Sequence, residues 1–433
     1  MARIAIVGAG IAGLSAAHAL RQHAHVTLFE ADGRFGGHAH TVDVTLRGVT
    51  HGVDTGFLVF NHRTYPNLVR LFDELQVATA PSEMSFSVQD PASGLEWCGN
   101  DLNGVFAQRR NLLRPRFWGM LADILRFNRL ATGLAARGAE AELSEPIGDF
   151  LRRHGFSDAF RDGYFLPMIG CIWSCPTDQM LRFPVATLIR FCHNHGLLQV
   201  TDRPQWHTVV GGSREYVRRI VAGLPDCRAG TAVRSLRRVP PGLGHGGVVL
   251  ATSTGEERFD HVVLACHSDQ ALALLSDASP AERQLLGAIR YQRNRAVLHT
   301  DSTLLPQRRR AWAAWNYERA SDRQREQAVV CLHYLINRLQ PLPWTDPVVV
   351  TLNPAREPAP QQVLGEFDYA HPVFDAAATS AQRRLHEIQG ASRLWFAGAW
   401  TRYGFHEDGL MSGLAAAQGV CDQLAAAPMA RAA

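Results

Sequence analysis

Residues 4–37 read IAIVGAGIAGLSAAHALRQHAHVTLFEADGRFGG, and this stretch decides the fold of the chain. The short apolar run that opens it, Ile4–Val7, is typical of a buried parallel strand. The glycines Gly8, Gly10 and Gly13 follow as GxGxxG. Such glycines allow a tight turn, a close approach of the backbone to a pyrophosphate, and contact between helix and strand.

The residues that follow complete a dinucleotide-binding unit. A helix is expected over Leu14–Arg21, with its positive end toward the phosphates. A second strand, Val26–Phe29, leads to Glu30, at about the spacing of a ribose-binding acid, some 20 residues after the first glycine. The alternative is a glycine turn in another kind of α/β protein, which does not account for the ordered strand, helix, strand and acid.

A second glycine turn, Gly33-Arg34-Phe35-Gly36-Gly37, comes directly after the acid. It resembles the pattern of the flavin amine oxidase and phytoene desaturase superfamily. The resemblance implies FAD as the cofactor, since a plain NAD dehydrogenase has no need of this turn. We expect non-covalent FAD, because no cysteine stands in position for a covalent link.

The C-terminal region carries a matching signal. Leu394–Gly398 (LWFAG) predicts a strand that ends in glycine, and Tyr403–Gly413 (YGFHEDGLMSG) opens a helix that continues through Leu424. This pair resembles the closing flavin motif of the superfamily. The two ends of the chain therefore agree on one ligand.

A third segment resembles the superfamily between these ends. A hairpin over 41–53 leads into Asp54-Thr55-Gly56-Phe57, which is similar to a turn that lies against the flavin ring. The alternative is a strand-ending turn with a buried Phe57. His38 stands where amine oxidases usually carry Arg. Together these segments imply a set of cofactor-binding residues: Gly8, Gly10, Ala12, Gly13, Glu30, Arg34, Gly36, Gly37, His38, Thr55, Gly56, Phe57, Val233, Gly398, Asp408, Gly409, Leu410 and Ser412.

The predicted fold class is α/β, with a doubly wound Rossmann-type FAD domain and an interleaved α+β substrate domain. We expect the FAD domain to comprise residues 1–85, 205–275 and 390–433, and the substrate domain residues 86–204 and 276–389. The substrate domain is expected to be helical from Val105 to about Gly196. In the FAD domain, Ser213 is expected to cap a helix through Ala222. A strand is expected over Thr231–Val239, where the resemblance implies that Val233 lies beside the adenine. In the substrate domain, strands are expected within 82–98 and at Arg295–Thr300, Ala328–Leu335 and Pro347–Leu352. Trp312, Trp315, Tyr317 and Tyr334 could line a cavity or fill the core.

Composition excludes several classes of protein. The chain has 433 residues and a formal net charge of +4, which does not suggest a nucleic-acid binder. No apolar stretch is long enough to cross a bilayer, and the fingerprint occupies the residues that could imitate a signal peptide, so we expect a cytoplasmic protein with reduced cysteines. His193-Asn194-His195 lacks a partner at helical spacing, so we expect no metal site.

Arg109–Phe127 predicts an amphipathic helix that is rich in arginine and aromatic residues. Such a helix can lie on an anionic membrane. It can equally bury its apolar face in the core and hold its arginines in water, and this alternative is favoured.

Smaller motifs narrow the resemblance. Six motifs look like a bacterial subgroup of flavoproteins associated with cyclopropane-type fatty-acid synthases and with furan fatty acids: GGHAHTVDV, DTGFLVFN, VLHTD, WNY, the His371-Pro372 pair and GFHEDGLMSG. Amine oxidases of the superfamily use a Lys beside the flavin, and this chain has none. The matching strand offers Asn294, Arg295 and His299, of which Arg is too basic to accept a proton. These points disfavour ordinary amine oxidation.

A second GxGxxG match, within Pro241–Gly247 (PGLGHGG), sits between two strands with no following helix, so we predict a turn there. With one GxGxxG in a dinucleotide-binding context, the expected electron donor is the organic substrate and not a nicotinamide. We expect a desaturase or oxidase that takes hydride from an apolar or lipid substrate. An amine oxidase, a redox-neutral isomerase and a non-catalytic flavin protein remain as alternatives. His406 and then Glu407 are the candidates for proton transfer, although His406 could instead bond the backbone of its turn.

Overall fold

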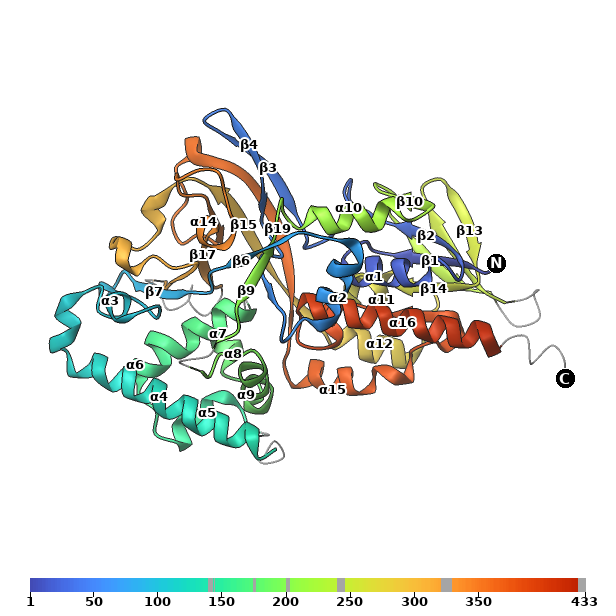
Figure 1. The fold of residues 1–433 in the computed structure, drawn as a ribbon. Coiled ribbons are helices and arrows are strands. Elements are labelled where there is room, and N and C mark those ends of the chain that lie inside the picture. The colour runs from blue at the N-terminus through green and yellow to red at the C-terminus, as the bar shows by residue number, and fades with distance from the viewer. Residues whose placement is uncertain are drawn as a thin grey trace.

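The computed structural model describes residues 1–138, 143, 145–173, 177–199, 203–239, 246–320 and 329–426. The segment that the sequence predicts to be a turn, Pro241–Gly247, lies largely outside these residues, as does Cys175. Figure 1 shows two parts side by side, with both chain termini on the dinucleotide-binding part.

The dinucleotide-binding part is built on a five-stranded parallel sheet. Its order is β10 (Asp226–Arg228), β2 (His25–Phe29), β1 (Arg3–Val7), β14 (His261–Leu264) and β20 (Leu394–Phe396). Val7 pairs with Phe29 on one side and Leu264 on the other, so the carboxyl ends of the three central strands are aligned. The Rossmann-type sheet predicted from the sequence is confirmed.

Both faces of this sheet are covered, which explains its continuous apolar strands. On one face, α1 (Ile11–Leu20) and α16 (His406–Ala426) bury Ile4 and Ile6. On the other, the antiparallel strands β11 (Ser235–Arg238), β12 (Val248–Thr252) and β13 (Gly255–Phe259) bury Ala5 and Val7. The helices on that second face are α11 (Ser268–Leu274), α12 (Pro280–Gly287) and α15 (Ala376–Arg384).

Two of these placements differ from the sequence-based expectation. The strand expected over 231–239 begins only at Ser235. The helices α12 and α15 pack on the dinucleotide sheet, although the predicted boundaries at 275 and 390 put them in the substrate domain. Their apolar faces fit the sheet, and periodicity alone does not reveal which of two cores a helix covers.

The helices α1 and α16 approach each other through glycine. A Cβ atom on Gly413 would lie 2.1 Å from the carbonyl oxygen of Ala12, and one on Gly13 would lie 1.8 Å from that of Gly8. The Ser15 hydroxyl is 3.2 Å from the carbonyl oxygen of Leu410. The two chain ends are therefore joined at backbone distance beside the first glycine turn.

The substrate part contains a seven-stranded mixed sheet. Its order is β19 (Val363–Val373), β15 (Arg290–His299), β18 (Val349–Leu352), β17 (Cys331–Leu335), β16 (Trp315–Glu318), β7 (Phe86–Asp90) and β8 (Leu95–Cys98). The strands expected within 82–98, near 295–300 and near 347–352 are present. The parallel pairing of β7 with β16, which unites distant parts of the chain, was not predicted.

Helices lie beside this sheet (Figure 1). They are α3 (Leu102–Val105), α4 (Pro115–Ala136), α5 (Ile147–Arg153), α6 (Asp158–Phe160), α7 (Leu166–Trp173), α8 (Thr177–Met180) and α9 (Val185–Asn194). The single helix expected over 109–127 is instead a 3₁₀ turn, η1 (Arg109–Leu113), followed by α4. Pro115 explains the break, because proline fits the first turn of a helix but not its interior.

Short elements connect the two parts. The hairpin of β3 (Thr41–Leu46) and β4 (Val49–Asp54) turns at Arg47 and Gly48, both with positive φ. A small sheet joins β5 (Phe60–Asn61), β9 (Trp206–Val209) and β6 (Thr79–Ser82), flanked by α2 (Pro66–Leu75) and α10 (Arg214–Ala222). None of the described helices is long and apolar enough to cross a membrane.

Candidate active site

One cavity of about 1540 Å³ connects the two parts of the molecule. Its first end lies at the carboxyl ends of β1 and β2, where parallel α/β sheets bind their ligands. Its far end lies between the seven-stranded sheet and helices α4 and α7. A ligand in this cavity can therefore touch both parts at once.

The first glycine turn forms the floor of the nucleotide end. Gly8 has φ of +102°, and a Cβ atom there would lie 2.8 Å from the carbonyl oxygen of Ala265. A Cβ atom on Gly10 would meet no protein atom within 4 Å, and Gly10 lines the cavity. The open space above Gly10 suits a group that must come close to the backbone.

The N-terminus of α1 points its donors at the same place. Gly10 is the N-cap and supplies no side-chain hydrogen bond, while Ile11 and Ala12 line the cavity. The first N–H groups of a helix carry a positive partial charge. An uncapped ten-residue helix at this position fits a pyrophosphate.

Glu30 lies at the end of β2, on the wall of the cavity. Its carboxylate accepts hydrogen bonds from the backbone N–H groups of Ala9, at 2.8 Å, and Asp32, at 3.0 Å. The side chain is thereby fixed beside the glycine turn, where a ribose would lie. Val233, expected to lie near the adenine, also lines this end.

Two further side chains present buried polar atoms without a protein partner. The Nη1 atom of Arg34 and the Nε2 atom of His38 are both buried and unbonded, and both residues line the cavity. Buried donors and acceptors rarely lack a partner in a folded protein. An anionic dinucleotide would supply these partners, so the residues present fit FAD.

The middle of the cavity is lined by the segments that resemble flavin-binding motifs. Gly56, Phe57, Gly398 and His406 all contribute to the wall. The His406 ring stacks on Phe57 with 3.8 Å between ring centroids, and its Nε2 atom lies 2.7 Å from the Tyr216 hydroxyl. Burial lowers the pKa of His406 to about 3, so the imidazole is neutral near pH 7.

Three more histidines meet beside this position. The ring centroid of His38 lies 5.3 Å from that of His371 and 6.3 Å from that of His267. Nδ1 of His371 lies 2.9 Å from the amide nitrogen of Asn294. Burial, and then repulsion from His267, lowers the pKa of His371 to about 4. The cluster is therefore neutral and not cationic.

Some predicted site residues line the cavity and others support it. The lining includes Gly8, Gly10, Ala12, Glu30, Arg34, Gly37, His38, Gly56, Phe57, Val233, Gly398 and His406. The residues behind the wall are Gly13, Gly36, Thr55, Asp408, Gly409, Leu410 and Ser412. Among these, the Ser412 hydroxyl accepts from the Gly398 N–H at 2.8 Å and so holds the end of β20.

Glu407 is placed differently from its neighbour His406. Its carboxylate accepts from the backbone N–H groups of Asn67 and Leu68 and thus caps α2. It is buried and does not line the cavity. This geometry favours a structural role, and its predicted part in catalysis stays a prediction.

Ser213, expected to cap α10, instead donates its hydroxyl to Asp54.

The far end of the cavity is apolar. Its wall includes Phe86, Trp97, Phe106, Leu121, Ile124, Tyr164, Met168, Ile172, Trp315 and Tyr334. Of the four aromatic residues singled out from the sequence, Trp315 and Tyr334 face the cavity, edge to face at 4.9 Å, whereas Trp312 and Tyr317 pack elsewhere. The cavity thus passes from a polar cradle to an aromatic tunnel.

A family model described as flavin-containing amine oxidoreductase matches residues 11–303, more than half of the chain. The chain belongs to this family. FAD is therefore the cofactor that fits the dinucleotide cradle. The chain spans about three fifths of the length of the curated relatives that it matches.

Individual proteins show the same relationship. AofH of Mycobacterium tuberculosis, described as a flavin-containing monoamine oxidase, is 26% identical over 298 residues, which cover 65% of this chain and 61% of AofH. A fatty acid isomerase from P. acnes that produces CLA has a TM-score of 0.68 at 17% identity, with 95% of this chain and 97% of that one covered. Cyclohexylamine oxidase from Brevibacterium oxydans has a TM-score of 0.67 at 18% identity, with 98% and 99% covered. At these identities the two structures share the fold.

The strand that should carry the amine-oxidase Lys has other residues in the structure. Asn294 is buried and hydrogen-bonded to His371 and Asn353. Arg295 lies outside the cavity and pairs with Glu357 and Glu366. None of these residues offers a basic amine to the cavity.

His193 and His195 do not form a shared site. His195 donates from Nδ1 to the Phe191 carbonyl at 3.0 Å and stacks on the Phe191 ring. In the described part of the chain, one group of three side chains has the spacing of metal ligands: Glu318, Cys331 and His333.

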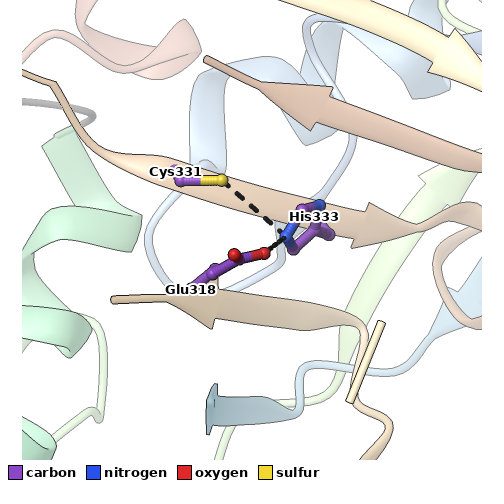
Figure 2. A group of neighbouring side chains, drawn as sticks. All are labelled: Glu318, Cys331 and His333. Carbon is purple, nitrogen blue, oxygen red and sulfur yellow. Dashed lines mark hydrogen bonds and ion pairs between the residues drawn. The ribbon is translucent and has the colours of Figure 1, made fainter. Parts of the chain in front are cut away.

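Figure 2 shows this buried trio, in which Nε2 of His333 lies 2.9 Å from Glu318 and 3.7 Å from the sulfur of Cys331. It lies on the face of the sheet opposite the cavity, because strand residues alternate and Trp315 and Tyr334 face inward. Burial lowers the pKa of His333, but Cys331 and Glu318 outweigh this and raise it to about 9. A protonated Nε2 that donates to Glu318 has no lone pair for a metal, so we assign a buried ion pair.

The Glu30 carboxylate should hold FAD through a charge-assisted hydrogen bond. Glu30→Ala should weaken FAD binding by about 1.5–3 kcal/mol, and Glu30→Gln by less, since it keeps the shape. The affinity is measured by flavin fluorescence during titration of apoprotein. Glu387→Ala, an exposed acid far from the cavity, is the control. If both Glu30 variants bound FAD as tightly as the Glu387→Ala control, the assignment of Glu30 to FAD binding would be contradicted.

The His333–Glu318 pair should make stability depend on pH. Because the folded-state pKa of about 9 exceeds the usual 6.5, the pair stabilises fully below about pH 6.5, and its contribution is lost as pH rises through about 9. Glu318→Gln should lower the free energy of unfolding near pH 6 by about 1–3 kcal/mol and flatten this dependence. The prediction is tested by urea unfolding of both proteins between about pH 6 and pH 9. If the free energy of unfolding varied with pH in the same way for the variant and the wild type, the prediction would be refuted.

Proposed function

We propose that the protein takes hydride from an apolar, fatty-acyl-type substrate with FAD as the acceptor. The supporting observation is the continuity of the aromatic tunnel with the cofactor cradle in one cavity. A chain lying in the tunnel can bring one carbon to the flavin position while its remainder stays in apolar surroundings. The FAD itself supplies a two-electron acceptor when bound.

The acidic residues of the cavity support an apolar substrate over an amine. Glu30 and Asp32 lie at the nucleotide end, Glu83 pairs with Arg338, and Asp368 is exposed. The described wall therefore presents no buried, unpaired carboxylate to an ammonium group near the tunnel. A buried ammonium without such a partner would be costly.

The tunnel residues bind and orient the chain and exclude water. Phe86, Trp97 and Tyr164 contact one another edge to face or tilted, with centroid distances from 6.1 to 6.4 Å. Removal of two hydrogens as hydride and proton leaves a new carbon–carbon double bond. An unactivated C–H bond is a poor hydride donor, so positions beside an existing double bond should react, and a dry site strengthens fixed electrostatic interactions with the developing charge.

His406 is our candidate to take the proton. It lines the cavity beside Phe57, and the hydrogen bond to Tyr216 fixes its ring. In the tautomer that donates from Nε2 to the Tyr216 oxygen, Nδ1 keeps a free lone pair that can accept the proton. His371 is less suited, because its Nδ1 atom accepts a hydrogen bond from the Asn294 amide. The neutral ring then carries its proton on Nε2 and has no free lone pair.

The substrate class is tested by anaerobic mixing of the FAD-loaded protein with candidate donors. Unsaturated fatty acids should bleach the flavin absorbance, and primary amines and polyamines should not. NADH and NADPH should act slowly or not at all, since the chain has one dinucleotide fingerprint. Bleaching by an amine alone would reverse the choice in favour of an amine oxidase.

Product analysis separates the remaining alternatives. A shifted double bond without net bleaching would identify a redox-neutral isomerase, for which the fold shared with the P. acnes enzyme provides a precedent. Absence of both bleaching and product with every donor would support a non-catalytic flavin protein.

The proton-transfer step is tested separately with His406→Ala. Flavin reduction should slow by about 10²–10⁴-fold, the usual contribution of a general base, while the FAD affinity stays unchanged. Tyr216→Phe should slow reduction less, because it removes only the group that orients the ring. If His371→Ala slows reduction and His406→Ala does not, the roles of the two histidines are exchanged.

A further inference from the structure

Exposed apolar side chains gather at one place on the described surface. Five of its nine large exposed apolar residues fall within 24 residues of the chain, and we name this set the apolar rim: Leu102, Leu112, Leu113, Trp118 and Leu125. Leu113 is 87% exposed and Leu102 is 77% exposed. Isolated exposed apolar residues are ordinary, but a contiguous group marks an interaction site.

The apolar rim is also the mouth of the aromatic tunnel. Leu102, Trp118 and Leu125 are exposed and at the same time line the cavity. Figure 1 places α3 and α4, which carry them, at the end of the molecule opposite the two termini. The tunnel therefore opens through this apolar surface and away from the nucleotide end.

Four arginines border the rim: Arg109, Arg110, Arg114 and Arg116. All are exposed, and the hydrogen bonds of the first three go to neutral groups, such as the Asn103 side chain and the Gly94 carbonyl. Within the described residues none of the four lies in ion-pair distance of an acid, whereas Arg126, further along α4, pairs with Asp123. These charges are thus available to an external anion.

We propose that the apolar rim and its four arginines dock on an anionic lipid bilayer, from which the substrate enters the tunnel. The proposal rests on the proposed function in taking a lipid as the substrate. Apolar side chains flanked by arginine are the features that place a helix at a membrane interface. Trp118, whose Nε1 atom donates to the Leu112 carbonyl at 2.9 Å, suits the headgroup level.

A second copy of this chain is a poorer occupant of the same surface. A symmetric dimer through the rim would bring two sets of these four arginines into one interface. Like charges that meet across an interface are costly. A bilayer with anionic headgroups instead neutralises the arginines and accepts the leucines in its acyl region.

The proposal is tested by flotation of FAD-loaded protein with vesicles of phosphatidylcholine alone or mixed with phosphatidylglycerol. The protein should float with the mixed vesicles, and high salt should release it. Each Arg→Gln change among the four should weaken binding about fivefold. Leu112→Ser with Leu113→Ser should weaken it at least about tenfold, and neither residue lines the cavity.

Matched controls replace exposed residues outside the rim. Val210→Ser with Leu364→Ser tests lost apolar surface, and Arg237→Gln with Arg258→Gln tests lost charge. Both control proteins should float as the wild type does. Failure of the wild type to float, or equal losses in rim and control variants, would overturn the proposal. The proposal would also be overturned if the wild type were a dimer in vesicle-free solution and Leu113→Ser dissociated it, because the rim would then bind a second copy of the chain.

Bleaching of the flavin by dispersed fatty acid distinguishes this proposal from the proposed function. The Leu112→Ser, Leu113→Ser protein should bleach at the wild-type rate with dispersed fatty acid and more slowly with acid supplied in mixed vesicles. Flotation without bleaching would leave the membrane surface standing and remove the substrate assignment. Bleaching without flotation would leave the substrate assignment standing and remove the membrane surface.

Discussion

The structure depends on the close approach of three backbones at the first glycine turn. The end of β1, the start of α1 and the start of α16 meet there, and side chains at Gly13 or Gly413 would overlap a neighbouring carbonyl oxygen. This contact leaves the N–H groups of α1 uncapped and aimed into the cavity. It also fixes α16, so that His406 and the turn before it reach the middle of the same cavity. One packing constraint therefore sets both the phosphate end and the flavin end of the site.

Local sequence was sufficient for the parts of the site that follow directly from strand ends. The strand, glycine turn and helix over 4–20, the placement of Glu30 beside the turn, and the glycine-ended strand near Gly398 are all present. In each case one short segment contains both the structural signal and the chemical group. The opening of the Gly10 backbone toward the cavity follows from the same pattern.

Features that need two distant segments could not be derived in this way. The histidine cluster exists because β19 pairs with β15, which brings His371 to Asn294, and because both lie near His38. The His–Pro pair was visible in the sequence, but its neighbours were not. The parallel pairing of β7 with β16 likewise joins segments more than 200 residues apart. Pro115, by contrast, was a local signal for the break before α4 that helical periodicity obscured.

The chemistry at the junction of the cavity explains why histidine suits position 38, where amine oxidases of the resembled superfamily usually carry Arg. His38, His371 and His406 all have lowered pKa values, chiefly because they are buried, and are therefore neutral near pH 7. A Lys or Arg at this junction would hold a positive charge beside the apolar tunnel, and a substrate without an anionic group could not compensate for it. Neutral imidazoles keep hydrogen-bonding capacity at the cofactor and add no charge to a cavity wall that already contains Arg34, Arg203 and Arg293. His38 in place of an Arg therefore leaves the junction with one fewer fixed positive charge.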